Sequence, residues 1–248
     1  MNVPSLLLLS AGLAAQAPVL KLGDPMPAFA LPGVDGRTLD AKALKGPAVI
    51  VFLSTQCPYV KASEARLNAL ARTFAGRVAF VGINSNESES EARREEGLAG
   101  MKARAAAQGY AFPYLKDEDQ SVIKAFGGLC TPDFFLFDGA GKLTYHGRLD
   151  DGGGREEAVT RQELKEALEA VLAGRAPAAA KPSRGCSIKW KSCAWILQLV
   201  QTEGGYGLLA LGSRCFRPCG GLSLDRRWGF RVQQEPRAES PEPNAYPG

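Results

Sequence analysis

The feature that most constrains this chain is a buried apolar run that ends close to a cysteine at the start of a helix. Residues 48–53, Ala-Val-Ile-Val-Phe-Leu, are apolar and rich in β-branched side chains, which is typical of a strand buried on both faces. Pro58 has the fixed φ that suits the first turn of a helix. From Val60 onward the apolar positions recur at helical spacing. The stretch therefore predicts an α/β fold in which a buried strand leads into an amphipathic helix.

Cys57 lies at this junction, beside the unpaired N–H groups of the predicted helix. The helix macrodipole favours an anion there, so a cysteine in this place is suited to react as a thiolate. The alternative is a small apolar side chain that packs at the end of a strand, which is common for cysteine. The polar segment Ser54-Thr55-Gln56 and the neighbouring proline favour the reactive interpretation.

The remaining elements are predicted from periodicity and turn residues. A charged helical stretch is expected to open at a capping box, Ser88–Glu91, and to be interrupted at Gly97 and Gly100. Its run of Glu and Arg is interpreted as a solvated face. The other predicted elements are a second buried strand (78–83), a short helix capped at 117–120, a hairpin (134–137 and 143–146) and an amphipathic helix (161–172).

Four motifs carry a resemblance to a known family. They are Leu53-Ser-Thr-Gln-Cys-Pro-Tyr-Val-Lys61, Ile83-Asn-Ser-Asn86, Cys130-Thr-Pro-Asp-Phe-Phe-Leu-Phe-Asp138 and Gly185-Cys-Ser-Ile-Lys-Trp-Lys191. Together they resemble thioredoxin-fold proteins, and more closely the peroxiredoxin-like redoxins of the alkyl hydroperoxide reductase/thiol-specific antioxidant group, over roughly residues 22–191. The resemblance implies a thioredoxin-like fold, with a central mixed β-sheet flanked by helices and here followed by an irregular C-terminal extension.

The resemblance also implies roles for individual residues. Cys57 is the expected nucleophile. A cis Thr131-Pro132 bond is expected to lie against it, with Cys130 close by. Ser54 stands where peroxiredoxins have a threonine, and it keeps the hydroxyl. Val60 stands where thioredoxins have the second cysteine of Cys-x-x-Cys, so the usual partner thiol is absent.

The second thiol must therefore come from elsewhere. We rank Cys130 first, because it directly precedes the Thr-Pro loop, and Cys186 second, because it would need its Ala/Pro-rich arm to fold back. In that case Ile188 and Trp190 would provide an apolar anchor. An external thiol comes third, and the cysteines of the tail come last.

Two basic residues are candidates to support the thiolate. Lys61 lies one helical turn after Cys57, and Arg148 follows the predicted hairpin. A solvated lysine and a surface arginine are the alternatives. His146 is the only histidine of the chain and is expected to be structural. One histidine and scattered cysteines do not support a metal site, and no cofactor is expected.

Two hypotheses about function follow. The first is an exported thiol oxidoreductase that takes a peroxide or disulfide substrate and is regenerated by an external thiol reductant. Peroxidase and disulfide reductase activity both stay open. The second is a non-catalytic thioredoxin-fold module whose cysteines form structural disulfides and whose face binds a partner. The net charge, +4, is small, and much of the excess of Lys and Arg lies after Lys181, so no nucleic-acid surface is expected.

The termini differ in character from the domain. Residues 1–17 resemble an export signal, with an apolar run at 6–15 and the cleavage pattern Ala15-Gln-Ala17, although no Lys or Arg precedes the run and Pro18 would follow the cut. Export implies a periplasmic or secreted protein without stable membrane insertion. The predicted organisation is then a redoxin domain (18–176), an arm containing Cys186 (177–191) and a low-order tail (192–248), with disorder expected from about residue 225.

Overall fold

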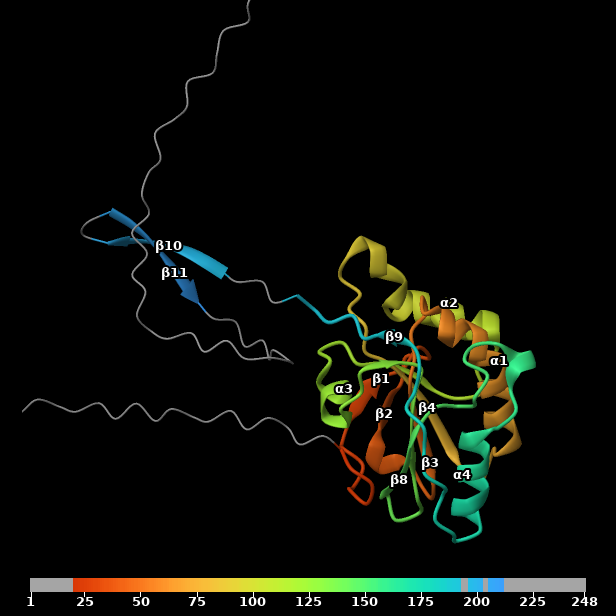
Figure 1. Ribbon diagram of the computed structural model, residues 1–248. Coiled ribbons are helices and arrows are strands. Elements are labelled where there is room, and N and C mark those ends of the chain that lie inside the picture. The colour runs from red at the N-terminus through yellow and green to blue at the C-terminus, as the bar shows by residue number, and fades with distance from the viewer. Residues whose placement is uncertain (1–19, 193–195, 203–204, 212–248) are drawn as a thin grey trace, which may run out of the picture. The chain divides into compact units, whose positions relative to one another are not determined.

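A computed structural model describes residues 20–192, 196–202 and 205–211, and its centre is a five-stranded mixed sheet (Figure 1). The strand order is β5-β4-β3-β7-β8, in which β3, β4 and β5 are parallel and β7 and β8 are antiparallel to their neighbours. The predicted mixed sheet is confirmed. Its strands are β3 (Ala48–Phe52), β4 (Ala79–Asn84), β5 (Tyr114–Lys116), β7 (Asp133–Phe137) and β8 (Leu143–Gly147).

Strand β3 occupies the middle of this sheet, and all five of its residues are buried. Val49 and Val51 point into one apolar core, whereas Ile50 and Phe52 point into another on the opposite face. Because side chains alternate along a strand, a continuous apolar run can supply both cores at once. The apolar run at residues 48–53 therefore lies in the layer that the two cores share.

Helices cover both faces of the sheet (Figure 1). Helices α1 (Pro58–Thr73), α2 (Leu98–Gln108) and α4 (Glu163–Leu172) contribute to the core that contains Val49 and Val51. Helix α3 (Ser121–Phe126) and the β1–β2 hairpin (Ala30–Pro32 and Thr38–Asp40) contribute to the core that contains Ile50 and Phe52. This layering places the N-terminus of α1, and with it Cys57, at the end of the central strand.

The segment before α2 differs from the prediction. The capping box at Ser88–Glu91 is not formed, because the hydroxyl of Ser88 donates to the carboxylate of Glu118 instead (3.4 Å). A 3-10 helix, η2 (Glu91–Glu96), replaces the first part of the expected helix. The prediction of a solvated Glu/Arg face is wrong for Glu96, which is fully buried.

The helix α3 begins as predicted. Its first free N–H groups, those of Val122 and Ile123, donate to the buried carboxylate of Asp117 at 3.3 and 3.0 Å. The helix ends at Gly127 with a positive φ of 69°, which suits glycine because it lacks a Cβ atom.

The arm after α4 folds back along the domain. The backbone N–H of Arg148 donates to the carbonyl of Lys181 at 3.1 Å, so the arm follows the end of β8. The short strand β9 (Cys186–Ser187) then pairs antiparallel with β6 (Cys130–Thr131), and Ile188 is buried in the core beneath α3. The predicted apolar anchor of the arm is confirmed.

The chain divides into two compact units, Met1–Ser192 and Cys193–Gly248. In the second unit, β10 (Ile196–Thr202) and β11 (Gly205–Leu211) form an antiparallel hairpin, which the sequence analysis did not expect in this range. The predicted export signal and the tail cysteines lie outside the described residues. Among the helices of the described part of the chain, none is long and apolar enough to cross a membrane.

Candidate active site

Cys57 is the N-cap residue that directly precedes helix α1, and it is only 2% exposed. Its backbone N–H donates to the hydroxyl of Ser54 at 3.1 Å, and its carbonyl accepts from the N–H of Lys61 at 3.0 Å. The first helical residue is Pro58, which has no N–H group. The next two N–H groups of α1 lack intrahelical acceptors and are the ones that can stabilise negative charge at this end of the helix.

The Thr131-Pro132 segment lies against Cys57, as the family resemblance implies. Its peptide bond is cis. The Sγ atom of Cys57 donates to the carbonyl oxygen of Thr131 at 3.1 Å. The hydroxyl of Thr131 is buried and has no hydrogen-bond partner among the described residues. Cys57 is thus enclosed between the N-terminus of α1 and the Thr131-Pro132 segment.

Two further cysteines approach the same point, and all three are free thiols. Cys186 is opposite Thr131 in the β6–β9 pairing, and Cys130 is opposite Ser187. Burial raises the pKa of Cys186 to about 11, assisted by a hydrogen bond to the Cys57 side chain and by its charge. Burial raises the pKa of Cys130 to about 12, assisted by the charges of Asp133 and Cys57. The charge of Cys57 thus contributes to the raised pKa of both Cys130 and Cys186.

The turn before Cys57 is held by a carboxylate that the sequence analysis missed. Glu96 accepts from the hydroxyl of Ser54 (2.6 Å), the N–H of Thr55 (3.0 Å) and the N–H of Gln56 (3.2 Å). It also accepts from the side chain of Asn84 at 2.6 Å. Nothing in the sequence separates Glu96 from the other acidic residues of its run, and only the packing of η2 against the turn distinguishes it.

The two predicted basic residues differ in their placement. Lys61 is exposed on the first turn of α1. Arg148 is half-buried, and its guanidinium pairs with the carboxylate of Glu163, with 2.9 Å between Nε and Oε1. The guanidinium charge is therefore directed to Glu163 rather than left unpaired toward the thiol.

His146 has the contacts of a structural histidine. Its Nε2 atom lies 3.1 Å from a carboxylate oxygen of Asp133, and its ring stacks on Phe135 with 4.0 Å between the centroids. Within the described ranges, no group of three or more His, Cys, Asp and Glu side chains is arranged to hold a metal ion.

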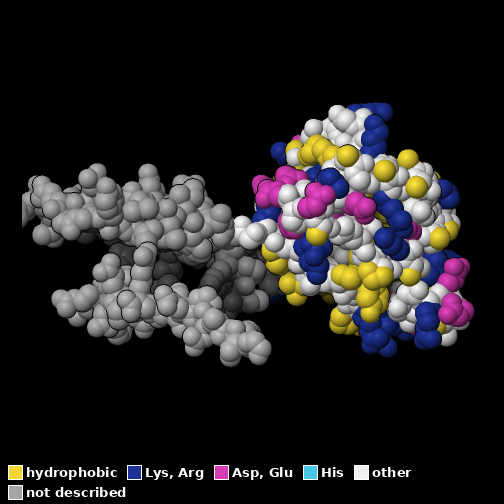
Figure 2. All heavy atoms as spheres, turned by 90° about the horizontal axis from the view of Figure 1, so that it is seen from above, with side chains coloured by type: hydrophobic (Ala, Val, Ile, Leu, Met, Phe, Trp, Pro, Cys, Tyr) yellow, Lys and Arg dark blue, Asp and Glu magenta, His cyan; other side chains and the backbone are white. Residues whose placement is uncertain are grey.

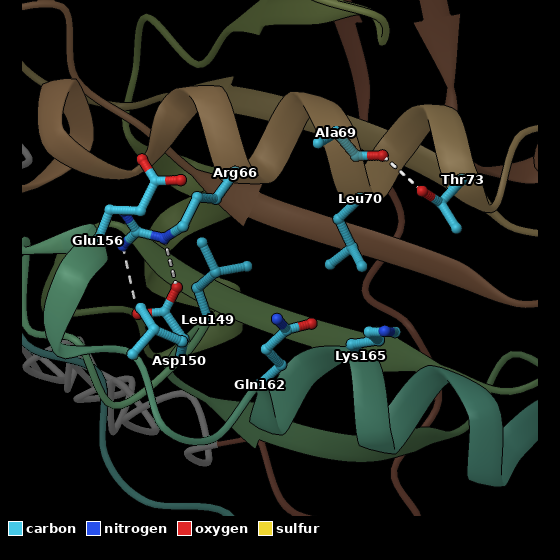
Figure 3. Close-up of a pocket in the computed structure, with 10 residues that line it drawn as sticks. Arg66, Ala69, Leu70, Thr73, Leu149, Asp150, Glu156, Gln162 and Lys165 are labelled. Atoms are coloured by element: carbon cyan, nitrogen blue, oxygen red, sulfur yellow. Dashed lines mark hydrogen bonds and ion pairs between the residues drawn. The ribbon is translucent and has the colours of Figure 1, made fainter.

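The larger of two cavities on this side of the sheet lies away from the thiols. It measures about 260 Å³, opens between α1 and α4, and contains the Arg66–Asp150 ion pair (Figure 3). None of its lining residues is a predicted site residue. A smaller cavity of about 40 Å³ reaches Pro132 and is bordered by Tyr59 and Arg148. This smaller hollow is the one next to the thiol site.

Charged side chains of both signs are interspersed over the face of the molecule seen in Figure 2. Lys and Arg alternate with Asp and Glu there, and hydrophobic side chains lie between them. Neither sign dominates that face.

Comparison with known proteins agrees with this geometry. A thiol:disulfide interchange protein DsbE of Pseudomonas fluorescens is 30% identical over 165 residues, which cover 64% of this chain and 82% of that protein. A thiol-disulfide oxidoreductase ResA of Bacillus anthracis is 23% identical over 163 residues, covering 65% of this chain and 82% of that protein. A protein of Mycobacterium tuberculosis named as a peroxiredoxin is 34% identical over 109 residues, covering 42% of this chain and 62% of that protein.

Among solved structures, a conserved protein of Geobacillus kaustophilus has a TM-score of 0.67 and 41% sequence identity, covering 71% of this chain and 95% of that one. A protein of Sinorhizobium meliloti has a TM-score of 0.66 and 40% identity, covering 71% of this chain and 98% of that one. The sequence profile of the AhpC/TSA family matches residues 22–146, about half of the 248 residues. With the thioredoxin-like arrangement of sheet, helix and thiol, this match shows that the chain belongs to the AhpC/TSA family.

Proposed function

We propose that the protein is a thiol oxidoreductase in which Cys57 is the nucleophile and Cys186 is the second thiol. The observation that carries this proposal is the convergence of both thiols on Thr131. Cys57 Sγ lies 3.1 Å from the carbonyl of Thr131, and Cys186 is the strand partner of the same residue. The exposed turn of α1 and the hollow beside Pro132 supply an approach to this point.

A small oxidant fits this arrangement better than a protein disulfide does. Because Cys57 is 2% exposed, a folded disulfide-containing partner would have to displace surrounding chain before its sulfur could reach the thiol. A hydroperoxide needs only a narrow opening. We therefore assign hydroperoxide as the substrate class.

The chemistry then runs in three balanced steps. The Cys57 thiol, which is hydrogen-bonded to the carbonyl of Thr131, is deprotonated, and its thiolate attacks the terminal peroxide oxygen. The O–O bond breaks, Cys57 becomes a sulfenic acid, and the leaving alkoxide takes a proton to give an alcohol, or water from hydrogen peroxide. The Cys186 thiol attacks the sulfenic sulfur, releasing water and forming a Cys57–Cys186 disulfide. An external dithiol reduces this disulfide, returning both thiols and leaving as its own disulfide.

Cys186 is placed ahead of Cys130 in this scheme, the reverse of the order inferred from the sequence. Cys186 is opposite Thr131, whose carbonyl oxygen accepts from Cys57 Sγ, whereas Cys130 is opposite Ser187. Cys130 also has the higher raised pKa of the two, about 12 against about 11, so a smaller fraction of it is thiolate near neutral pH. Both differences favour Cys186 as the resolving thiol.

Disulfide exchange is the second candidate function. It is favoured by the DsbE and ResA relatives, whose names describe thiol:disulfide interchange and thiol-disulfide oxidoreduction. The same two thiols would serve, with the arm lifted from Cys57. The non-catalytic alternative required structural disulfides, and the three described cysteines, which are free thiols, give it no support.

The test compares the full-length protein with C57S, C186S and C130S variants. Hydroperoxide and insulin disulfide consumption are each measured with a dithiol reductant, and peptides are mapped after one equivalent of peroxide. We expect peroxide turnover in the wild type, none in C57S, and a Cys57–Cys186 linked peptide that persists in the matched control C130S. Full peroxide turnover in C57S would refute the role of Cys57. A Cys57–Cys130 peptide in the wild type would instead restore the order inferred from the sequence.

We also propose that the protein is exported, with cleavage after about Ala17. The support is the apolar run at 6–15 followed by small residues. Intact-mass analysis of protein isolated from its native host should give a chain that starts near Pro18. A soluble chain that retains Met1 would contradict export.

A further inference from the structure

The turn that delivers Cys57 is built around a single buried carboxylate. Glu96 presents one oxygen to Ser54 Oγ (2.6 Å) and Gln56 N (3.2 Å) and the other to Thr55 N (3.0 Å) and Asn84 Nδ2 (2.6 Å). A carboxylate accepts and never donates when ionised, and its two oxygens offer about four lone-pair directions. The four donors match that capacity, and Glu96 itself is fully buried.

Ser54 links this carboxylate to the nucleophile. Its hydroxyl has one proton, which is donated to Glu96 at 2.6 Å. The hydroxyl oxygen can then only accept on its other side, and there it receives the backbone N–H of Cys57 at 3.1 Å. Glu96 thus fixes the direction of both of these hydrogen bonds: Ser54 donates to the Glu96 carboxylate and accepts from the backbone N–H of Cys57.

The 3-10 helix that carries Glu96 is fastened to the same turn by two further bonds. The hydroxyl of Thr55 donates to the carbonyl of Glu95 at 3.0 Å. The side-chain amide of Gln56 donates to the carbonyl of Ala92 at 2.8 Å. Because three consecutive residues of the turn contact η2, the turn has little freedom to move relative to the sheet.

We propose that Glu96 and Ser54 are positioning residues for Cys57. This inference rests on the proposed function of Cys57, which it deepens. Glu96 takes up the N–H groups of Thr55 and Gln56, and Ser54 takes up that of Cys57, so the backbone holds Sγ at the N-terminus of α1 and against Thr131. Neither residue touches the reacting atoms. Their effect is on the orientation of the nucleophile.

The substitutions that test this are E96Q, S54A and S54T in the full-length chain. A glutamine at 96 has the same size but brings N–H groups to one side of the site, where they face other donors. S54A removes the hydroxyl, whereas S54T keeps it. The matched control is E64Q, because Glu64 is an equally buried carboxylate that binds Arg104 and Tyr110 and has no contact with the turn.

Two measurements are made below the unfolding transition of every variant. The first is the dithiol-dependent rate of hydroperoxide consumption, with kcat and KM separated. We expect E96Q and S54A to lower kcat by roughly tenfold to a hundredfold, the range for a nucleophile displaced by a fraction of an ångström, with S54T near wild type and E64Q unchanged. The second is amide hydrogen exchange of Thr55, Gln56 and Cys57, which should accelerate in E96Q and not in E64Q.

The results separate this inference from the function on which it rests. Full peroxide turnover in C57S would refute the proposed function of Cys57. The amide exchange of the turn in E96Q would then still test whether Glu96 holds the backbone. Unchanged amide exchange in E96Q, or equal loss of kcat in S54T and S54A, would overturn the positioning role. Loss of turnover in E64Q as large as in E96Q would mean that any buried carboxylate has this effect, which would overturn it as well.

Discussion

Cys57 and Cys186 share one neighbouring residue, Thr131. The Cys57 Sγ atom lies 3.1 Å from the Thr131 carbonyl oxygen, and Cys186 is opposite Thr131 in the β6–β9 ladder. The two cysteines are 129 positions apart in the sequence. Their proximity depends on how a two-residue strand of the C-terminal arm is held, and the predictions below test what holds it.

A glycine permits the close approach of the arm to Thr131. A Cβ atom on Gly185 would overlap the carbonyl oxygen of Thr131, which is backbone and cannot move aside alone. We expect G185A to displace β9, to lower the free energy of unfolding by about 1 to 3 kcal/mol and to reduce the yield of the Cys57–Cys186 disulfide. Chemical denaturation and peptide mapping measure the two effects.

The control for this substitution is G139A. A Cβ atom on Gly139 would have only Pro47 Cδ nearby, at 4.0 Å. G139A should therefore match the wild type in disulfide yield. A G185A protein with wild-type stability and disulfide yield would show that β9 does not need this approach.

Two backbone groups of the arm are bound by the side-chain amide of Gln120. Its Nε2 donates to the carbonyl of Lys189 at 2.8 Å, and its Oε1 accepts from the N–H of Lys191 at 2.9 Å. We expect Q120A to loosen the arm and to accelerate alkylation of Cys186 severalfold, since each lost buried hydrogen bond costs about 1 to 3 kcal/mol. Time-resolved alkylation followed by mass spectrometry measures the rate.

Asn68 provides the matched control for Gln120. It is also a buried side-chain amide that binds two backbone groups, the carbonyl of Gln108 and the N–H of Ala111, away from the arm. N68A should leave the alkylation rate of Cys186 unchanged. Equal acceleration in N68A and Q120A would indicate general loosening rather than release of the arm.

The raised pKa of Cys186 predicts a distinctive pH dependence in the reduced protein. Burial and the Cys57 side chain raise this pKa to about 11 and so favour the neutral thiol. Since only the thiolate reacts, alkylation of Cys186 should rise about tenfold per pH unit and level off near pH 11. In C57S the midpoint should fall, because a serine does not ionise and the charge of Cys57 is gone. A wild-type midpoint near 9, the ordinary value, would contradict the burial of Cys186 in the reduced protein.

Two truncations distinguish the arm from the tail. A chain that ends at Lys191 keeps β9 and the buried Ile188, and it should unfold at nearly the wild-type temperature. A chain that ends at Arg184 loses both, and the loss of Ile188 burial alone costs about 1.5 to 3 kcal/mol. Calorimetry and the alkylation rate of Cys57, which should rise only in the shorter chain, compare them. A large loss of stability in the longer chain would show that the tail stabilises the domain.

Local sequence determined the central strand, the order of the main elements and the place of the nucleophile candidate, whereas the edge strand β5 was not predicted. The apolar run at 48–53 has no polar residue at which a solvent face could begin, so it had to be central. Pro58 and the apolar spacing after it fixed the start of α1 one residue after Cys57. The four motifs carried the fold family, and with it the cis bond between Thr131 and Pro132.

Only the tertiary structure decided which groups meet at Cys57. Glu96 resembles its solvated neighbours in the sequence, because charge patterns do not encode which member of a run faces a turn about forty residues away. Cys130 was ranked before Cys186 because it directly precedes the Thr-Pro loop, and the pairing of Cys186 with Thr131 could not be read from the sequence. Hydrophobic periodicity and helix-capping residues act over a few positions, so they can be recognised in the sequence. Contacts between distant segments depend on the summed packing of both cores, which no local pattern contains.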